Sequence, residues 1–199
     1  MSSITSDFSV ITFPHPTLRY PSKPIQRVDK QLKLIVDEMF RLMYEHKGVG
    51  LAANQVDLPI RLFVANPTGR SDEGEPLVFI NPVISRGKGI EEFEEGCLSL
   101  PGINANIKRN KSIHVNAYDI NGNEINQLFD GFVARIIQHE TDHLDVVLII
   151  DRLGDAVLRS FEKELDTLQS DYSSRQRTGS LPSDEDMLAR RLDWEKRYC

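Results

Sequence analysis

The stretch "GFVARIIQHETDHLDVV", residues 131–147, constrains the fold most, because it predicts a helix with one face that changes from apolar to polar along its length. At 3.6 residues per turn, one side of this helix carries Phe132, Ile136, His139, Glu140 and His143. This side begins apolar and ends polar. We therefore expect the helix to pass from a hydrophobic core into a cleft.

The remaining patterns predict short strands between helices, so the chain reads as one α+β domain. Asp29 suits an N-cap and Gly48 a helix stop, which bounds an N-terminal helix. The runs "IRLFVAN" and "LVFINPVIS" indicate strands, with Pro82 marking a sheet edge or a strand break. "SIHVNAYDINGNEINQLF" predicts a hairpin, in which Asn121 and Gly122 supply the positive φ angles of a tight turn.

The chain changes character at residue 170. A further helix is expected from about Ala156 to Leu168, whereas the polar segment that follows lacks periodicity and indicates a linker. "SDEDMLARRLDWEKRYC" then predicts a short helix with acids at its start and bases near its end. We expect a main domain over 1–169 and a linker with a C-terminal helix over 170–199. That helix either docks a partner or, as the simpler interpretation, lies on the domain.

Composition excludes several classes of protein. A net charge of −6 and a pI near 5.4 argue against a nucleic-acid binder, which needs a basic surface. No run of about 18 apolar residues is present, so we expect no membrane span. The first 20 residues lack the features of a secretory or organelle-targeting segment. Two distant cysteines, Cys97 and Cys199, make a disulfide framework improbable.

The pair His139 and His143 can bind one metal ion, because positions four apart share a helix face. Glu140 can then serve as the base toward a metal-bound water. Catalytic sites of this kind use three protein ligands. No histidine follows His143, so the third ligand is expected upstream, where Cys97 follows the flexible Gly96.

A third stretch, "GVGLAANQ" at residues 48–55, combines small residues with an amide. Its small side chains permit close approach of another backbone or a ligand. Gln55 can donate a hydrogen bond to an oxygen that gains negative charge during a reaction. Taken alone, the stretch is equally explained by a helix stop followed by a packed turn.

Together, these three stretches resemble the three motifs of the peptide deformylases. "GVGLAANQ", "EGCLS" at 95–99 and "QHETDHL" at 138–144 occur in the family's order and spacing, and "FPHPTLR" resembles its N-terminal signature. The similarity runs to "VVLIIDRL" and covers roughly three quarters of the chain. We therefore expect the family's fold, with antiparallel or mixed β-sheets wrapped around a central HExxH helix and an N-terminal helix, to which this chain adds a C-terminal helical extension.

The resemblance implies a metal-dependent hydrolase that removes the N-formyl group from the formylmethionine of new proteins and releases formate. It assigns the metal to Cys97, His139 and His143, and the proton transfer to Glu140. Gln55 and the backbone N–H of Leu98 would stabilise the oxygen. The family favours one Fe²⁺ per chain, with Zn²⁺ or Ni²⁺ as substitutes, although ligand softness alone also fits Zn²⁺.

Further residues are assigned by motif alignment. Glu95 and Arg109 should pair and hold the Cys97 loop, unless they form an ordinary surface ion pair worth ~0–1 kcal/mol. Gly50 suits a place where the substrate backbone pairs with the enzyme. The expected methionine pocket, for which core packing is the competing interpretation, consists of Val49, Phe93, Phe132 and Ile136.

The chain departs from the family pattern at two places. Val146 stands where the family has a glycine after the metal helix, and we expect it to prolong that helix by one or two residues without abolishing activity. The tail beyond about Gln169 is longer than a minimal deformylase needs.

Other functions remain to be weighed. A general metallopeptidase would leave Cys97 and "GVGLAANQ" unexplained, and a formyl-peptide-binding homologue without strong catalysis would be expected to lack Glu140 or Gln55. A structural metal domain would need four protein ligands. The expected partners are nascent formylmethionyl peptides and, as a further candidate, the ribosome, with no nucleic-acid specificity and no membrane. We expect a monomer in the cytoplasm, where Cys97 stays reduced.

Overall fold

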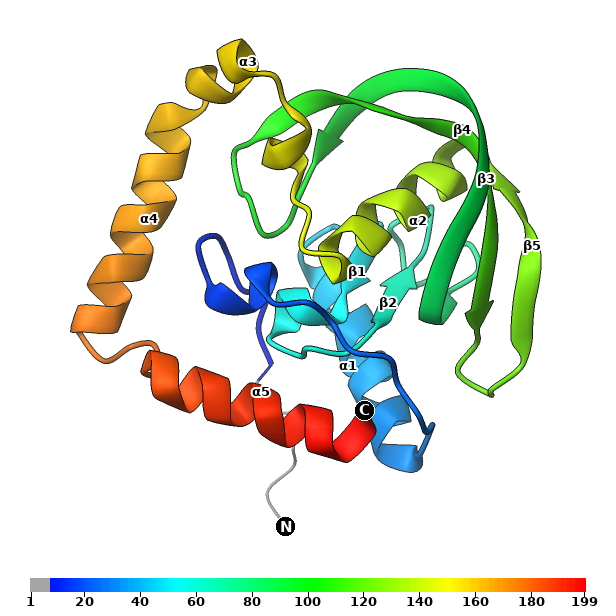
Figure 1. Ribbon diagram of the computed structural model, residues 1–199, viewed down its shortest axis with the longest axis horizontal. Helices are drawn as coiled ribbons and strands as arrows, with labels where there is room; N and C mark the ends of the chain where they lie inside the picture. Colours follow the sequence, from blue (N-terminus) through cyan, green and yellow to red (C-terminus); the bar gives the residue numbers. More distant parts are fainter. Residues whose placement is uncertain (1–7) are drawn as a thin grey trace.

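Residues 8–199 are described by a computed structural model, in which one five-stranded antiparallel sheet surrounds a helix (Figure 1). The first seven residues, which include part of the segment expected to carry no targeting signal, lie outside the described residues. The strands, in sheet order, are β1 (Gly50–Ala52), β2 (Leu62–Ala65), β3 (Leu77–Gly96), β4 (Asn104–Tyr118) and β5 (Glu124–Asp130). The helices are α1 (Lys30–Glu45), α2 (Gly131–Leu144), α3 (Asp155–Ser160), α4 (Glu162–Arg177) and α5 (Asp184–Tyr198). Short 3₁₀ turns lie at η1 (Pro16–Arg19), η2 (Ala53–Val56) and η3 (Ile149–Arg152).

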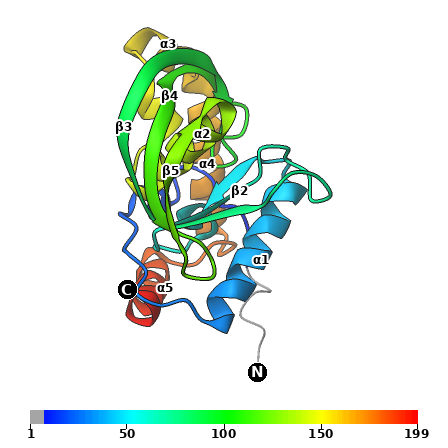
Figure 2. The same ribbon diagram turned by 90° about the vertical axis from the view of Figure 1, so that its right-hand side faces the viewer.

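The long β3–β4 hairpin arches over α2, as both views show (Figures 1 and 2). Its register shifts between Ile80 and Val83 and again between Ser85 and Lys88. The first shift contains Pro82, which cannot donate to the ladder, and such irregularities bend and twist a strand pair. The expected α+β fold with a sheet wrapped around the HExxH helix is therefore confirmed.

The N-terminal helix forms as expected. The Asp29 side chain accepts a hydrogen bond from the Leu32 N–H at 2.8 Å, which caps α1. The helix ends at Glu45, just before Lys47 takes a left-handed conformation at φ 57°. Its apolar stripe is buried in the core and consists of Leu32, Ile35, Val36, Met39 and Met43.

The β4–β5 hairpin is present, but its turn differs from the predicted one. The loop spans 119–123. Gly122 has φ 82°, whereas Asn121 is not among the residues with positive φ. The Asp119 carboxylate accepts the backbone N–H groups of Asn121 and Asn123, both at 2.8 Å, and this side-chain turn replaces the tight two-residue one.

Two helices replace the single helix expected over 156–168, because the backbone breaks at Phe161 between α3 and α4. The linker expected from residue 170 is wrong for its first part, since α4 continues to Arg177 and only 178–183 connects it to α5. The predicted division at 169/170 falls inside α4. The division of the chain into a catalytic domain and a tail at this point stays a prediction.

Helix α5 forms as predicted and lies on the domain, across the N-terminal segment and next to α1 (Figure 1). Its Tyr198 side chain is 1% exposed and donates a hydrogen bond to Asp29. Arg191 donates to Thr17 Oγ1 at 3.2 Å, and Arg190 pairs with Asp57 at 2.7 Å. The simpler interpretation, in which the C-terminal helix lies on the domain, therefore holds for the face of α5 that carries these residues. Among the described helices, none is both long and apolar enough to cross a bilayer.

The end of α2 contradicts the expectation for Val146. The helix stops at Leu144, and Val146 has φ 69°. The Val147 N–H bonds to Asp142 O at 2.8 Å and the Val146 N–H to His143 O at 3.2 Å, which is the Schellman pattern of a helix end. Valine thus occupies the left-handed position that favours glycine and does not prolong the helix.

We predict that Val146→Gly stabilises the protein. Left-handed backbone costs a residue with a side chain about 1–2 kcal/mol, from which the greater chain entropy of glycine subtracts about 0.5–1 kcal/mol. A net gain near 1 kcal/mol should raise Tm by roughly 2–4 °C in scanning calorimetry. Val147→Gly is the matched control, because Val147 lacks a positive φ and its change to glycine should lower Tm. Equal Tm shifts in both variants would contradict the strain at Val146.

Candidate metal centre

The three candidate ligands come together from two elements. Cys97 directly follows β3, while His139 and His143 stand one turn apart on α2. Their ligand atoms all lie within 4.8 Å of one another, and Cys97 Sγ is 3.2 Å from His143 Nε2. Ligand atoms that share one tetrahedral ion at ~2.0–2.3 Å are separated by about 3.3–3.8 Å. The spacing therefore fits a single metal ion with only small adjustment.

The two imidazoles differ in their electrostatics. Burial lowers the pKa of His143 well below its usual value, which keeps the ring neutral as metal binding requires. Burial acts in the same direction on His139, but the hydrogen bonds that its ring donates to Cys97 and Glu95 outweigh burial and raise the pKa of His139 to about 10. A metal ion must therefore displace a proton from His139.

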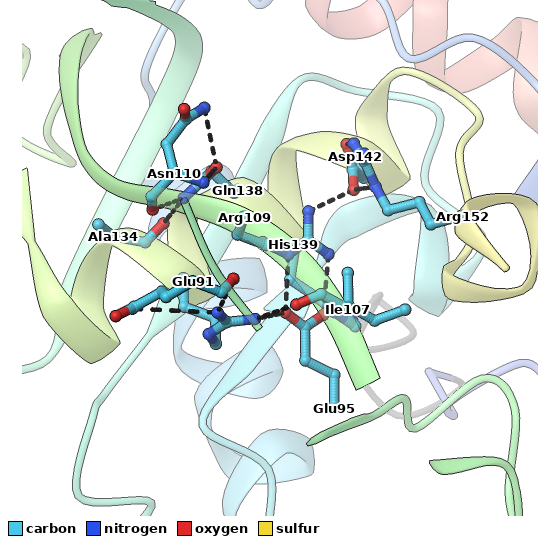
Figure 3. A network of polar contacts seen from close by, with 11 residues as sticks. Glu91, Glu95, Ile107, Arg109, Asn110, Ala134, Gln138, His139, Asp142 and Arg152 are labelled. Carbon is cyan, nitrogen blue, oxygen red and sulfur yellow. Dashed lines mark hydrogen bonds and ion pairs between the residues drawn. The ribbon is translucent and has the colours of Figure 1, made fainter. Parts of the chain in front are cut away.

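The Glu95 carboxylate is the centre of a buried ion-pair network (Figure 3). Arg109 donates to both of its oxygens, at 2.7 and 2.8 Å, and Arg135 donates to one of them at 2.7 Å. His139 Nδ1 lies 3.0 Å from the other oxygen, which leaves its Nε2 for a metal. Burial would raise the pKa of Glu95, but the bonds from Arg109 and His139 hold it well below its usual value.

The predicted pair of Glu95 and Arg109 is thus present, and it is not a surface pair, since the side chains are 7% and 2% exposed. Arg109 also reaches Asp142 on α2 at 2.6 Å, and Arg152 donates to the same carboxylate. The network therefore joins β3, β4, α2 and η3 (Figure 3).

The Gln55 side chain is oriented by the backbone three residues before it. Its Oε1 accepts the Ala52 N–H at 2.8 Å, so the Nε2 group must face the other way. Nε2 lies 3.1 Å from Ser99 Oγ and 3.7 Å from Cys97 Sγ. The amide N–H groups are therefore directed toward the candidate metal ligands.

Glu140 projects against the backbone of β1. A Cβ added at Gly50 would lie 2.8 Å from Glu140 Cδ and closer still to Oε1, so only glycine leaves room for the carboxylate. The side chain is 4% exposed, and burial raises the pKa of Glu140 to about 7, against the opposing charge of His139. A carboxyl group with this pKa can exchange a proton near neutral pH.

A cavity of about 410 Å³ opens beside these groups. Its wall includes Val49, Gly50, Gln55, Cys97, Leu98, Phe132, Ile136, His139 and Glu140, which were all predicted site residues. Of the other predicted residues, Glu95 also lines the cavity, whereas His143, Arg109 and Phe93 do not. The Phe93 ring is 55% exposed, and its centroid lies 5.1 Å from the Arg135 guanidinium.

Comparison with known proteins agrees with this arrangement. A model of the family described as polypeptide deformylase matches residues 8–158. The chain belongs to the polypeptide deformylase family. It is 54% identical to the peptide deformylase of Rhodopirellula baltica over 190 residues, and this alignment covers 96% of this chain and 94% of that protein. It is also 40% identical to the chloroplastic peptide deformylase 1B of Solanum lycopersicum, over 96% of this chain and 67% of that protein.

Solved structures show the same fold for this deformylase. Peptide deformylase 1B of Arabidopsis thaliana is 42% identical with a TM-score of 0.80, over 88% of this chain and 96% of that one. The deformylase of Thermotoga maritima is 39% identical with a TM-score of 0.69, and it covers 74% of this chain and 97% of its own. The family match ends at residue 158, before α4 and α5.

Sequence reasoning missed several polar residues around the centre of this deformylase, namely Asn54, Ser99, Arg135, Asp142 and Arg152. Arg135 carried a usable signal. It stands one helical turn before His139, on a stretch whose neighbours are apolar, and a charge there must find a buried partner. Asn54, Ser99 and Asp142 stand inside the three quoted motifs, but their partners come from other segments, so their roles could not be assigned from the sequence.

We predict that Gly50→Ala impairs catalysis more than folding. The new methyl group would push aside the end of the Glu140 side chain, which is flexible enough to move but would leave its position in the cavity. We expect kcat to fall by at least about 10²-fold, the lower bound for loss of a positioned general base, with little change in Tm. Ala substitution at Gly154, where an added Cβ meets nothing within 4 Å, is the control. An unchanged kcat in Gly50→Ala would contradict the role of this close approach.

Proposed function

We propose that Cys97, His139 and His143 bind one divalent metal with which this peptide deformylase removes the N-formyl group from nascent formylmethionyl peptides and releases formate. The observation that carries this assignment is that the three ligand atoms lie within 4.8 Å of one another beside a cavity that Cys97, His139, Glu140 and Gln55 line. Three protein ligands leave a coordination position open, as catalysis requires.

Fe²⁺ is our proposal for the physiological metal, with Zn²⁺ and Ni²⁺ as substitutes. One thiolate and two imidazoles suit all three ions, so the preference for iron comes from the resemblance to the family. A thiolate ligand must stay reduced, which supports a reducing compartment such as the cytoplasm.

Once bound by Cys97, His139 and His143, the metal would lower the pKa of a water molecule from 15.7 to near 7. Glu140 would accept a proton from the attacking water and deliver a proton to the leaving amine. The oxygen of the formyl group gains negative charge, and the Gln55 amide and the Leu98 N–H donate hydrogen bonds to it. Glu95 and Arg109 act behind these groups by holding the Cys97 loop and the His139 ring.

For the methionine side chain, we propose the apolar part of the cavity wall. Val49, Phe132 and Ile136 line it. Gly50 lies on β1, whose second edge is not paired within the sheet, so its backbone can pair with the substrate chain. Phe93 is left out of this proposal because it does not line the cavity.

The alternative functions are less well supported. A general metallopeptidase gives no reason for Gln55 and Cys97 to converge on the histidines. A formyl-peptide-binding homologue without catalysis does not require a buried Glu140 that faces the cavity. A structural metal domain would need a fourth ligand, and within residues 8–199 the cluster holds three.

We further propose that the enzyme acts as a monomer, with residues 1–169 as the catalytic unit. Support for a monomer comes from α5, whose Met187 and Tyr198 are buried against the chain's own domain. The ribosome is a candidate partner for delivering the nascent chain. Light scattering of the purified protein tests the monomer directly.

The central test is formate release from a formylmethionyl peptide, with metal content measured on the same sample. We expect turnover that chelation abolishes. Glu140→Ala should lower kcat/KM by about 10²–10⁴-fold, because it removes the general base, while the metal is retained. Glu162→Ala, an exposed change in α4, is the control. Turnover that persists after chelation and in Glu140→Ala would exclude the proposed centre.

A second measurement tests whether Gln55 stabilises the negative charge on the formyl oxygen. Gln55→Ala should lower kcat by about 10²–10³-fold with metal content unchanged, since it removes one donor to the charged oxygen. Asn126→Ala, an exposed amide on β5, serves as the comparison. A rise in KM alone, with kcat unchanged, would show that Gln55 binds substrate without stabilising the transition state.

A further inference from the structure

The two histidines of the centre are held in different ways. His139 has Glu95 at its second ring nitrogen. Within residues 8–199, by contrast, no hydrogen-bond partner meets the buried Nδ1 of His143. Metal-binding histidines are usually oriented through that second nitrogen. The orientation of His143 must therefore be set by the backbone that carries it.

That backbone is held by Asn54. The Asn54 side chain is fully buried on η2, and its Nδ2 donates to the His143 carbonyl oxygen at 2.6 Å. The same oxygen accepts the Val146 N–H at 3.2 Å within the helix end. Asn54 thus contacts the strained turn at the metal ligand itself.

The direction of this amide follows from chemistry. With the amide turned over, Oδ1 would face a carbonyl oxygen, and two acceptors would repel each other. In the orientation present, the buried Oδ1 has no partner among the described residues, which costs stability. The single bond to His143 is therefore the one polar contact that this buried side chain contributes.

The helix end needs such support. Val146 occupies a left-handed position, which weakens the preference of the chain for this turn. Arg19 donates to the Val146 carbonyl at 2.9 Å, and the Ser22 N–H donates to the Leu144 carbonyl at 3.2 Å. Of these external donors, only Asn54 bonds the ligand residue directly.

We propose that Asn54 is a positioning residue for His143. By holding the last turn of α2, it fixes the imidazole toward Cys97 and keeps the metal centre in register with Gln55, its neighbour on η2. This inference rests on the proposed function, because it takes His143 as a metal ligand. It adds a residue that touches neither metal nor substrate.

The test measures metal retention and not turnover. Each protein is loaded with Co²⁺, and the visible spectrum of the bound ion and its rate of loss to a chelator are recorded. Asn54→Ala should alter the spectrum and weaken Co²⁺ binding by about 10–100-fold, as loss of an outer-shell partner does. Asn81→Ala is the matched control, because Asn81 Nδ2 also donates to a backbone carbonyl, that of Ile25, at 2.7 Å and away from α2.

Asn54→Ser guards against a folding defect, since it retains a polar group but is too short to keep the bond. If Asn54→Ala fails to fold, Asn54→Ser takes its place in the same comparison. Adding Val146→Gly should recover part of the lost Co²⁺ affinity, because it relaxes the turn that Asn54 supports. Wild-type spectrum and retention in the folded Asn54 variants would overturn the inference.

Failure of the proposed function looks different. Cys97→Ala should lose Co²⁺ binding if the centre is assigned correctly. If Cys97→Ala binds the ion as tightly as the wild type, the centre itself is wrong. If Cys97→Ala loses the ion while both Asn54 variants keep it normally, the centre stands and only the role of Asn54 falls.

Discussion

A buried carboxylate, that of Glu95, is the constraint on which the site depends. It sits at the end of β3, two residues before Cys97, and three side chains from β4 and α2 donate to it. A buried charge is costly unless it is paired and fully hydrogen-bonded, so Glu95 admits one arrangement of its neighbours. Its pairing with Arg109 and Arg135 brings the hairpin to the helix. Because Glu95 also contacts His139, the same carboxylate orients the ring of this proposed metal ligand.

The η2 turn links the rest of the site in a similar way. Two residues of η2 and the residue that follows it have different partners: Asn54 bonds His143, Gln55 faces the cavity, and Asp57 pairs with α5. Glu95 thus holds one side of the centre and η2 holds the other. Catalytic groups need positions accurate to a fraction of an ångström, and two independent anchors on opposite sides provide this better than either alone.

Much of the site could be predicted from sequence because its signals are local. The spacing of His139, Glu140 and His143 on one helix face, and the short motifs around Cys97 and Gln55, need no knowledge of the fold. Phe93 is among the candidates for the pocket, but its ring stacks against the guanidinium of Arg135, a residue of another element, and does not line the cavity. The chemistry of the motifs is local, whereas the packing around them is not.

The same distinction explains the errors in secondary structure. The end of α4 was read as a linker because it has no apolar period, but Tyr172 packs on His15 and hydrogen-bonds Met187, and these contacts maintain the helix. Val146 was expected to extend α2 because local propensity opposes a left-handed valine. The donors Asn54, Arg19 and Ser22 all come from distant parts of the sequence, so local propensity could not anticipate the outcome.

The contacts of α5 set an order for the making of the protein. Arg191 and Thr17 are 174 positions apart, and Tyr198 and Asp29 are 169 apart. During translation at ~5–20 residues per second, roughly 8–35 seconds separate the emergence of these partners. An enzyme that acts on other chains at their first residue therefore completes the contacts of its own Thr17 and Asp29 only after its final helix has been synthesised.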